Sequence, residues 1–324
     1  MPDRRSFLAA ATSLAAGAAL AQPAGGPRRI ALLTAFDRSS VDALVRPLMA
    51  ELDKLGWPEG RAITLLEPRF ADGQYERLPA MAAELVALKP DVILVQSAPA
   101  TRALMKATPT IPIVMVSVGD PVAYGIVRSL AEPGGNVTGA AFLADESARK
   151  AVALLKEMAP RIRTVAFFGR PENDGYKPMA RVLNEAAPVL RVEFRFVEVS
   201  SAADFEGAFA AILRMRADAL VTPPEPLITS QRMAIGRFAA ENRLPLAMVG
   251  NKRLLDAGPL LTYGPARDVY PALAARYVDR ILRGANPAKL PVEQPAKFEL
   301  GLNEAMASTL GLTIPQSIRI QAAE

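Results

Sequence analysis

The amino-acid sequence predicts an α/β fold with two lobes, each of them a parallel sheet covered by helices on both faces. Three observations lead to this prediction. The apolar segments of strand length are continuous rather than alternating, as in strands that are buried on both faces. Each is followed by a segment with apolar residues at helical spacing. The alternation pauses at residues 132–139 and then restarts, so the 324-residue chain divides into two α/β units of similar size.

The first unit begins with the apolar run 28–34 and a helical pattern over 39–56. Gly56 is expected to end this helix, whereas Pro47 inside it argues against a regular helix. A helix-like run at 126–131 precedes the pause. Further strands are predicted at 62–68, 91–96 and 111–118, and further helices at 75–89 and from about residue 100.

The second unit repeats the pattern and ends differently. The run 259–265 precedes a strong helix over 268–284, and the proline-marked segment 289–300 is expected to be extended. Such linkers in mid-chain and near the end indicate that the chain crosses between the lobes more than once. Strands are predicted at 164–169, 192–199, 218–223 and 245–249, and helices at 146–159, 176–190, 205–215 and 228–242.

The composition excludes several kinds of site. The chain has no Cys and no His, so thiolate nucleophiles, imidazole-based triads, disulfides and zinc sites of the usual ligand set are excluded. The 38 basic and 33 acidic residues give a net charge of +5 without a basic block, so nothing indicates nucleic-acid binding. We expect neither a metal nor a cofactor.

The N-terminus has the pattern of an export signal peptide, residues 1–21. Arg4 and Arg5 precede an Ala/Leu-rich stretch, and the A-x-A pattern that ends at Ala21 is a cleavage site. The arginine pair followed by Ser6, Phe7 and Leu8 resembles the twin-arginine signal, although an ordinary Sec signal remains open. No later segment has 18 or more uninterrupted apolar residues, so we expect a soluble mature protein. Because no Cys follows the cleavage site, we expect no lipid anchor, and we infer a periplasmic location.

The glycine stretch EPGGNVTG, residues 132–139, has three interpretations. A phosphate-binding loop needs a strand before it and a helix after it, whereas here a helix-like run precedes and an apolar strand follows. The sequence Asn136-Val137-Thr138 matches a glycosylation sequon, and we interpret this match as incidental. We therefore interpret Gly134 and Gly135 as a hinge, because glycine permits the dihedral angles of a helix stop and a sharp turn.

Three segments carry a family resemblance: IPIVMVSVGDPVAYGIVRSLAEPGGNVTG, AGPLLTYGP and VEQPAKFELGLNEAMASTLGLTIPQS. The chain resembles the ABC-transporter substrate-binding proteins of the tryptophan-importer type over nearly its whole mature length. The resemblance implies a type I periplasmic-binding fold, with two Rossmann-like three-layer lobes joined by three crossover strands near 137–141, 261–264 and 292–298. Lobe 1 would then comprise 28–138 and 265–291, and lobe 2 would comprise 139–264 and 292–324.

The binding cleft is expected at the carboxyl ends of the strands, where open parallel sheets bind their ligands. The residues that follow the predicted strands there are candidates. The candidate ligand-binding residues are Phe36, Asp37, Ser97, Ala98, Thr101, Asp120, Phe142, Arg170, Asn173, Glu225, Asn251 and Tyr263, and the candidate hinge residues are Gly134, Gly135 and Gly264.

These candidates predict the chemistry of the ligand. The N–H groups of 97–101 and the side chain of Arg170 suit a carboxylate, and the aromatic residues offer flat apolar surface. Asp120 and Glu225 could hold an ammonium group, as in the amino-acid-binding relatives. The chain departs from those relatives at Ala98-Pro99-Ala100-Thr101, Glu225-Pro226 and Phe142. We predict a small carboxylate-bearing solute, either amino-acid-like or an aromatic organic acid.

The predicted function is that of a monomeric periplasmic receptor, not an enzyme. It closes on the solute and delivers it to the permease and ATPase of an ABC importer. A ligand-binding partner of a membrane sensor kinase would have the same fold and cleft. A Rossmann-like enzyme would need Asp37, Asp120 or Glu225 as its general base, and no paired-carboxylate spacing supports that alternative.

Overall fold

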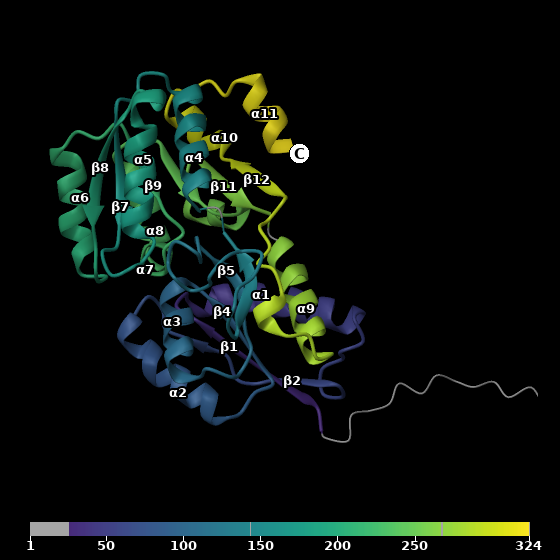
Figure 1. The fold of residues 1–324 in the computed structure, drawn as a ribbon. Helices are drawn as coiled ribbons and strands as arrows, with labels where there is room; N and C mark the ends of the chain where they lie inside the picture. Colours follow the sequence, from purple (N-terminus) through teal and green to yellow (C-terminus); the bar gives the residue numbers. More distant parts are fainter. Residues whose placement is uncertain (1–25, 143, 267, 324) are drawn as a thin grey trace, which may run out of the picture.

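The computed structural model describes residues 26–142, 144–266 and 268–323, so the predicted signal peptide lies outside the described residues. These residues form two α/β lobes that face each other (Figure 1). Lobe 1 contains the sheet built from the N-terminal part of the chain together with helix α9, and lobe 2 contains the second sheet and the C-terminal helices. The predicted fold class is confirmed.

The sheet of lobe 1 has only parallel strand pairs, and its order is β2-β1-β4-β5-β6, with β3 also paired to β1. One core lies between the sheet and helices α2 and α3, and a second core lies between the opposite face and helices α1 and α9. The strands are β1 Arg28–Thr34, β2 Ile63–Leu65, β3 Arg69–Phe70, β4 Val92–Gln96, β5 Ile113–Val118 and β6 Val137–Ala141. The helices are α1 Arg38–Lys54, η1 Tyr75–Arg77, α2 Leu78–Ala87, α3 Ala98–Ala107, α9 Val269–Leu282 and η3 Pro287–Lys289.

Lobe 2 has the strand order β12-β11-β10-β9-β7-β8, in which only β12 is antiparallel to its neighbour. Helices α4, α5, α10 and α11 cover one face of this sheet, and helices α6, α7 and α8 cover the other. The strands are β7 Thr164–Gly169, β8 Glu193–Glu198, β9 Ala219–Thr222, β10 Leu246–Val249, β11 Leu261–Pro265 and β12 Phe298–Leu302. The helices are α4 Ala144–Met158, α5 Tyr176–Leu190, α6 Asp204–Arg214, α7 Pro226–Ser230, α8 Arg232–Glu241, η2 Lys252–Ala257, α10 Glu304–Thr309 and α11 Gln316–Ala323.

Helix α1 shows how local sequence forms these elements and positions the cleft. The carboxylate of Asp37 accepts a hydrogen bond from the backbone N–H of Ser40 and caps the helix. Four apolar residues at helical spacing, Val41, Leu44, Leu48 and Leu52, are buried against the sheet. The helix runs through Pro47, and the chain turns away at Gly56, which has a φ of +89°.

Three predicted elements differ from the structure. Residues 126–131 are not helical: they follow a series of turns in which the N–H groups of Ile126 and Val127 both donate to the carbonyl of Pro121. Gly125, with a φ of +64°, interrupts any helical path there. The predicted strand 62–68 is shortened to β2, and β3 begins only after its predicted end. The predicted helix 228–242 is divided into α7 and α8.

The chain passes between the lobes after β6, after β11 and before β12. Strand β6 pairs with β5, so residues 139–141 belong to the sheet of lobe 1. Glu293 donates its N–H to the carbonyl of Gly139, which keeps residues 292–293 with lobe 1 as well. The lobe boundaries therefore lie a few residues beyond the expected positions 138 and 292.

Gly134 and Gly135 do not lie at a crossing between the lobes. They precede β6, and the N–H of Gly134 donates to the carbonyl of Ala288 within lobe 1. Because β6 runs from this end toward lobe 2, the two glycines occupy the opposite end of the strand from the crossing. Gly264, next to the last residue of β11, does lie at a crossing, and a side chain there would collide with the backbone of Gly250.

Candidate ligand-binding cleft

A cavity of about 240 Å³ lies between the two lobes. Its walls are formed mainly where the parallel strands of both sheets end, which is where the fold class predicts a ligand site. Aromatic and proline residues make up much of the wall. Lobe 1 contributes Phe36, Ser40, Leu44, Gln96, Ser97, Ala98, Ser117, Tyr124, Phe142 and Tyr270, and lobe 2 contributes Arg170, Asn173, Tyr176, Pro223, Pro224, Glu225, Pro226, Thr229, Arg232, Asn251 and Arg253, among others.

The structure brings together eight of the twelve residues that were expected to bind the ligand. Each follows the end of a strand, or begins the helix after it, and thereby reaches the cavity. These residues are Phe36, Ser97, Ala98, Phe142, Arg170, Asn173, Glu225 and Asn251.

The other four candidates do not line this cavity. The carboxylate of Asp37 caps helix α1 and binds Arg232, as described below. The hydroxyl of Thr101 donates to the carbonyl of Ser97 at 2.8 Å, inside helix α3. Asp120 accepts hydrogen bonds from two backbone N–H groups of its own turn. Tyr263 stacks on Phe298 with 5.9 Å between the ring centroids, where the chain crosses between the lobes.

Ser97 has the features of a ligand-binding residue. It adopts a φ of +79°, which is uncommon for a residue with a side chain, and it is only 7% exposed. Its hydroxyl has no hydrogen-bond partner among the described residues, and neither does the buried side-chain oxygen of the neighbouring Gln96. A strained backbone beside unpartnered buried polar groups in a cavity wall is typical of a functional site.

Helix α3 begins directly after Ser97 and points its N-terminus at the cavity wall. The first backbone N–H groups of a helix have no acceptor within the helix, and they carry a partial positive charge. Pro99 has no N–H, and Thr101 already donates to Ser97, so the N–H groups of Ala98 and Ala100 are the ones without an intrahelical acceptor. The Ser97 region therefore suits an anionic group.

Arg170 lies in the cavity wall with its guanidinium held by both lobes. Its Nη1 donates to the carbonyl of Gly73 at 2.6 Å and lies 3.7 Å from Oε1 of Glu225. The guanidinium carbon lies 3.7 Å from the centroid of the Tyr75 ring. Arg170 is 6% exposed, so these contacts are made away from bulk water.

Glu225 is held in the same cluster. One carboxylate oxygen accepts a hydrogen bond from the hydroxyl of Tyr75, and the other accepts the backbone N–H of Ile228 at 2.9 Å, which caps helix α7. Asn173 donates to the Tyr75 hydroxyl at 3.1 Å. We call Tyr75, Arg170, Asn173 and Glu225 the clamp, because Tyr75 belongs to lobe 1 and the other three belong to lobe 2.

Burial dominates the electrostatics of the clamp. Desolvation raises the pKa of Glu225, and the hydrogen bonds from Tyr75 and Ile228 and the charge of Arg170 offset this only in part. Desolvation, followed by the neighbouring Glu225 carboxylate, also raises the pKa of Tyr75 well above its ordinary value. Tyr75 therefore keeps its proton and acts as the hydrogen-bond donor.

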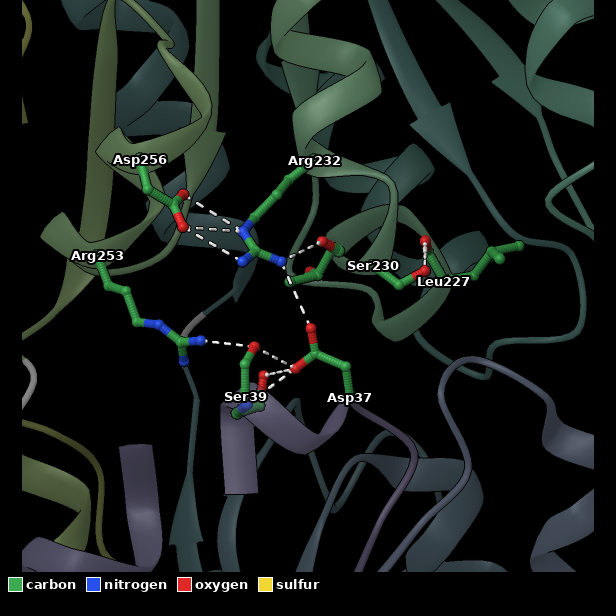
Figure 2. Close-up of polar contacts among 9 residues, drawn as sticks. Asp37, Ser39, Leu227, Ser230, Arg232, Arg253 and Asp256 are labelled. Atoms are coloured by element: carbon green, nitrogen blue, oxygen red, sulfur yellow. Dashed lines mark hydrogen bonds and ion pairs between the residues drawn. The ribbon is translucent and has the colours of Figure 1, made fainter. Parts of the chain in front are cut away.

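A second set of contacts joins the lobes at another part of the cavity wall (Figure 2). Arg232 of α8 binds Asp256 of lobe 2 at 3.2 Å and Asp37 of lobe 1 at 3.4 Å. Arg253 donates to the hydroxyl of Ser39 at 2.7 Å, and that hydroxyl donates in turn to Asp37. We call Asp37, Ser39, Arg232, Arg253 and Asp256 the latch.

Several of these residues were not predicted from the sequence. Tyr75, Gln96, Arg232 and Arg253 carried no motif that set them apart from ordinary helix or strand residues. The position of Gln96 could have indicated its role, since it is the last residue of strand β4 and directly precedes Ser97. The others gain their role from partners more than 90 residues away in the sequence.

Neither a metal site nor a membrane-spanning helix is found among the described residues. Within residues 26–142, 144–266 and 268–323, no group of three or more acidic side chains could hold a metal ion. In the same part of the chain, no helix has the length and apolarity that a bilayer crossing requires.

Comparison with known proteins agrees with this architecture. The chain is 24% identical over 285 residues to a tyrosine-binding protein of Clostridioides difficile, covering 88% of this chain and 81% of that protein. A Streptococcus pneumoniae ABC domain in complex with L-Trp superposes with a TM-score of 0.83 at 22% identity, over 92% of this chain and 99% of that one. A conserved domain protein of Vibrio cholerae superposes with a TM-score of 0.85 at 25% identity, over 91% and 98%.

The family model described as ABC transporter substrate binding protein matches residues 29–324, which include both lobes and all three crossings. The chain therefore belongs to the ABC transporter substrate-binding protein family.

Proposed function

We propose that this protein is a periplasmic receptor that closes on a small carboxylate-bearing solute and delivers it to the permease and ATPase of an ABC importer. The observation that carries the proposal is the Ser97 region. There, an unpartnered buried hydroxyl and the free N–H groups at the start of α3 meet in a cavity enclosed by two lobes. Such donors stabilise a negative charge.

The size and walls of the cavity indicate the scale of the solute. Its volume of about 240 Å³ is somewhat below the range of roughly 300–1,000 Å³ that is typical of ligand pockets. Phe36 and Phe142 in its wall supply apolar surface for the rest of the molecule. A solute of amino-acid or aromatic-acid size suits these dimensions, which is consistent with the amino acids named for two of the relatives.

The import role rests on the family, and the periplasmic location rests on the signal peptide predicted at residues 1–21. The polar contacts of the clamp and the latch support closure as the mode of binding, because both sets cross between the lobes. A ligand that contacts both lobes binds the closed form more tightly than the open form, and this difference in affinity shifts the equilibrium toward closure.

Thermal unfolding of residues 22–324 tests the carboxylate. A ligand that binds only the folded state, present at about 100 times its Kd, adds about 2.7 kcal/mol to the free energy of unfolding. We expect stabilisation by small carboxylic acids and none by their primary amides at equal concentration. Stabilisation by sugars or by the amides, without any by the acids, would contradict the proposal.

A further inference from the structure

The cavity wall contains an acidic side chain whose charge is already balanced. Glu225 is the only carboxylate in the wall among the described residues, and it is 4% exposed. Its two oxygens accept the Tyr75 hydroxyl and the Ile228 N–H, and the Arg170 guanidinium lies 3.7 Å away. A resident cation therefore occupies the position beside this carboxylate that the ammonium group of a ligand would need.

Three carboxylates near the rim, Asp37, Asp120 and Asp174, are engaged in a similar way. Asp37 binds Arg232 and two serine side chains, and Asp120 accepts two N–H groups of its own turn. Asp174 lies 2.5 Å from Nε of Arg102. Burial, followed by the like charge of Asp120, raises the pKa of Asp145 and so disfavours its charged form, and Arg149 and Arg181 offset this only in part. None of these four side chains lines the cavity.

An ammonium group that enters a closed cleft without an anionic acceptor loses its hydration and gains little in return. The unpartnered groups of the wall suit a different ligand. The Ser97 hydroxyl and the N–H of Ala98 can donate to an anion, whereas the unpartnered Gln96 side-chain oxygen is an acceptor without charge. The wall thus offers hydrogen-bond donors to a negatively charged group and no free acidic side chain to a positively charged one.

From this charge balance we infer that the solute is a carboxylic acid without an ammonium group, and that the receptor discriminates against free amino acids. The inference rests on the proposed function, because it assumes a carboxylate ligand. Arg170 is the residue that enforces the discrimination, since it neutralises Glu225 from within the protein.

Matched pairs of ligands test the inference by calorimetry on residues 22–324. The pairs are 3-phenylpropionate with L-phenylalanine, 3-(4-hydroxyphenyl)propionate with L-tyrosine, 3-indolepropionate with L-tryptophan, and 4-methylpentanoate with L-leucine. Within each pair the molecules differ only by the α-ammonium group. In every pair with measurable binding we expect the acid without the ammonium group to bind about 10 to 100 times more tightly.

The outcomes separate this inference from the proposed function. Equal or tighter binding of the L-amino acids overturns the inference and leaves the carboxylate receptor intact. If the primary amides of the acids bind as tightly as the acids, the carboxylate itself is not recognised, and both proposals fail. Absence of binding by every member at millimolar concentration also overturns both.

A variant tests the role of Arg170 directly. In Arg170→Gln, Glu225 loses its resident cation, so we expect the Kd ratio of L-amino acid to matching acid to fall by about tenfold. A general loss of closure or folding would weaken the binding of both ligands alike, so it would not change the ratio of their Kd values within one variant. The double variant Arg170→Gln with Glu225→Gln has no carboxylate among the described residues of the cavity wall, and its ratio should return toward that of the unaltered protein. A ratio unchanged by Arg170→Gln overturns the assigned role.

Discussion

The guanidinium of Arg170 in lobe 2 lies over the ring of Tyr75 in lobe 1, with 3.7 Å between the guanidinium carbon and the ring centroid. Both residues also contact Glu225, so aromatic, cationic and anionic groups from the two lobes meet at one point beside the cavity. Such contacts form only when the lobes approach each other. The stability of the closed form therefore depends on residues that need not touch the ligand.

Removal of the Tyr75 hydroxyl should weaken ligand binding through the clamp. In Tyr75→Phe the buried Glu225 loses a donor, which costs about 1 to 3 kcal/mol in the closed form, so we expect the Kd to rise about five- to a hundredfold. The matched control is Tyr263→Phe, because the Tyr263 hydroxyl has no hydrogen-bond partner among the described residues. Calorimetry that finds the same Kd for both variants would show that the clamp does not contribute to closure.

Loss of the latch should shift the protein toward an open form. Arg232→Ala removes the ion pair between α8 and Asp37, and we expect a larger radius of gyration in X-ray scattering without ligand and a Kd raised about fivefold. Arg237→Ala, on the exposed side of the same helix, serves as the control. Saturating ligand should compact both variants, so identical scattering of the two before ligand is added would argue against the latch.

The pH dependence of stability should report on Asp37. Burial alone would raise its pKa, but the hydrogen bonds from Ser40 and Ser39 and the charge of Arg232 lower it below the ordinary value of 3.8. A lowered pKa means that the stabilisation is complete above the pKa of the unfolded chain and is lost as the pH falls through the folded-state pKa.

We therefore expect Asp37→Asn to reduce the free energy of unfolding by a constant amount above about pH 5. The difference between variant and unaltered protein should shrink below pH 3.8. Denaturant titrations at a series of pH values measure it. A difference that grows on acidification would contradict the lowered pKa.

Ser97 should matter more for binding than for folding. Ser97→Ala removes a hydroxyl that has no partner among the described residues, so the melting temperature should change little while the Kd rises about five- to fifteenfold. Ser97→Gly relieves the backbone strain at a φ of +79° and should raise the melting temperature of the ligand-free protein. If Ser97→Ala lowers the melting temperature strongly and leaves the Kd unchanged, the hydroxyl is structural.

The arginine pair at the N-terminus should determine the export route. Changing both Arg4 and Arg5 to Lys should retain the precursor in the cytoplasm of a cell that has the twin-arginine machinery, as immunoblots of cell fractions would show. A variant with both residues of the A-x-A site, Ala19 and Ala21, changed to Leu should instead reach the membrane uncleaved. Normal export of the Lys variant would favour the Sec route.

The sequence by itself determined the α/β class and the edge of the sheets where the cavity lies. Continuous apolar strands must be buried on both faces, and the carboxyl ends of parallel strands lie along one edge, so residues that directly follow a strand reach the cleft. Ser97, Arg170 and Glu225, which were expected at the cleft for this reason, lie in the cavity wall. Asp120 does not line the cavity, because its carboxylate accepts the N–H groups of its own turn. The helix predicted over 126–131 is absent, and bends follow the turn at 121–125 instead.

Only the tertiary structure decided which charges pair. Tyr75 and Glu225 are 150 residues apart in the sequence, and Arg232 and Asp37 are 195 apart. No periodicity or motif connects such positions, because their contact depends on how closely two separately folded lobes approach. The balance of charge in the cavity follows from those pairs, and with it the kind of solute that the cleft can hold.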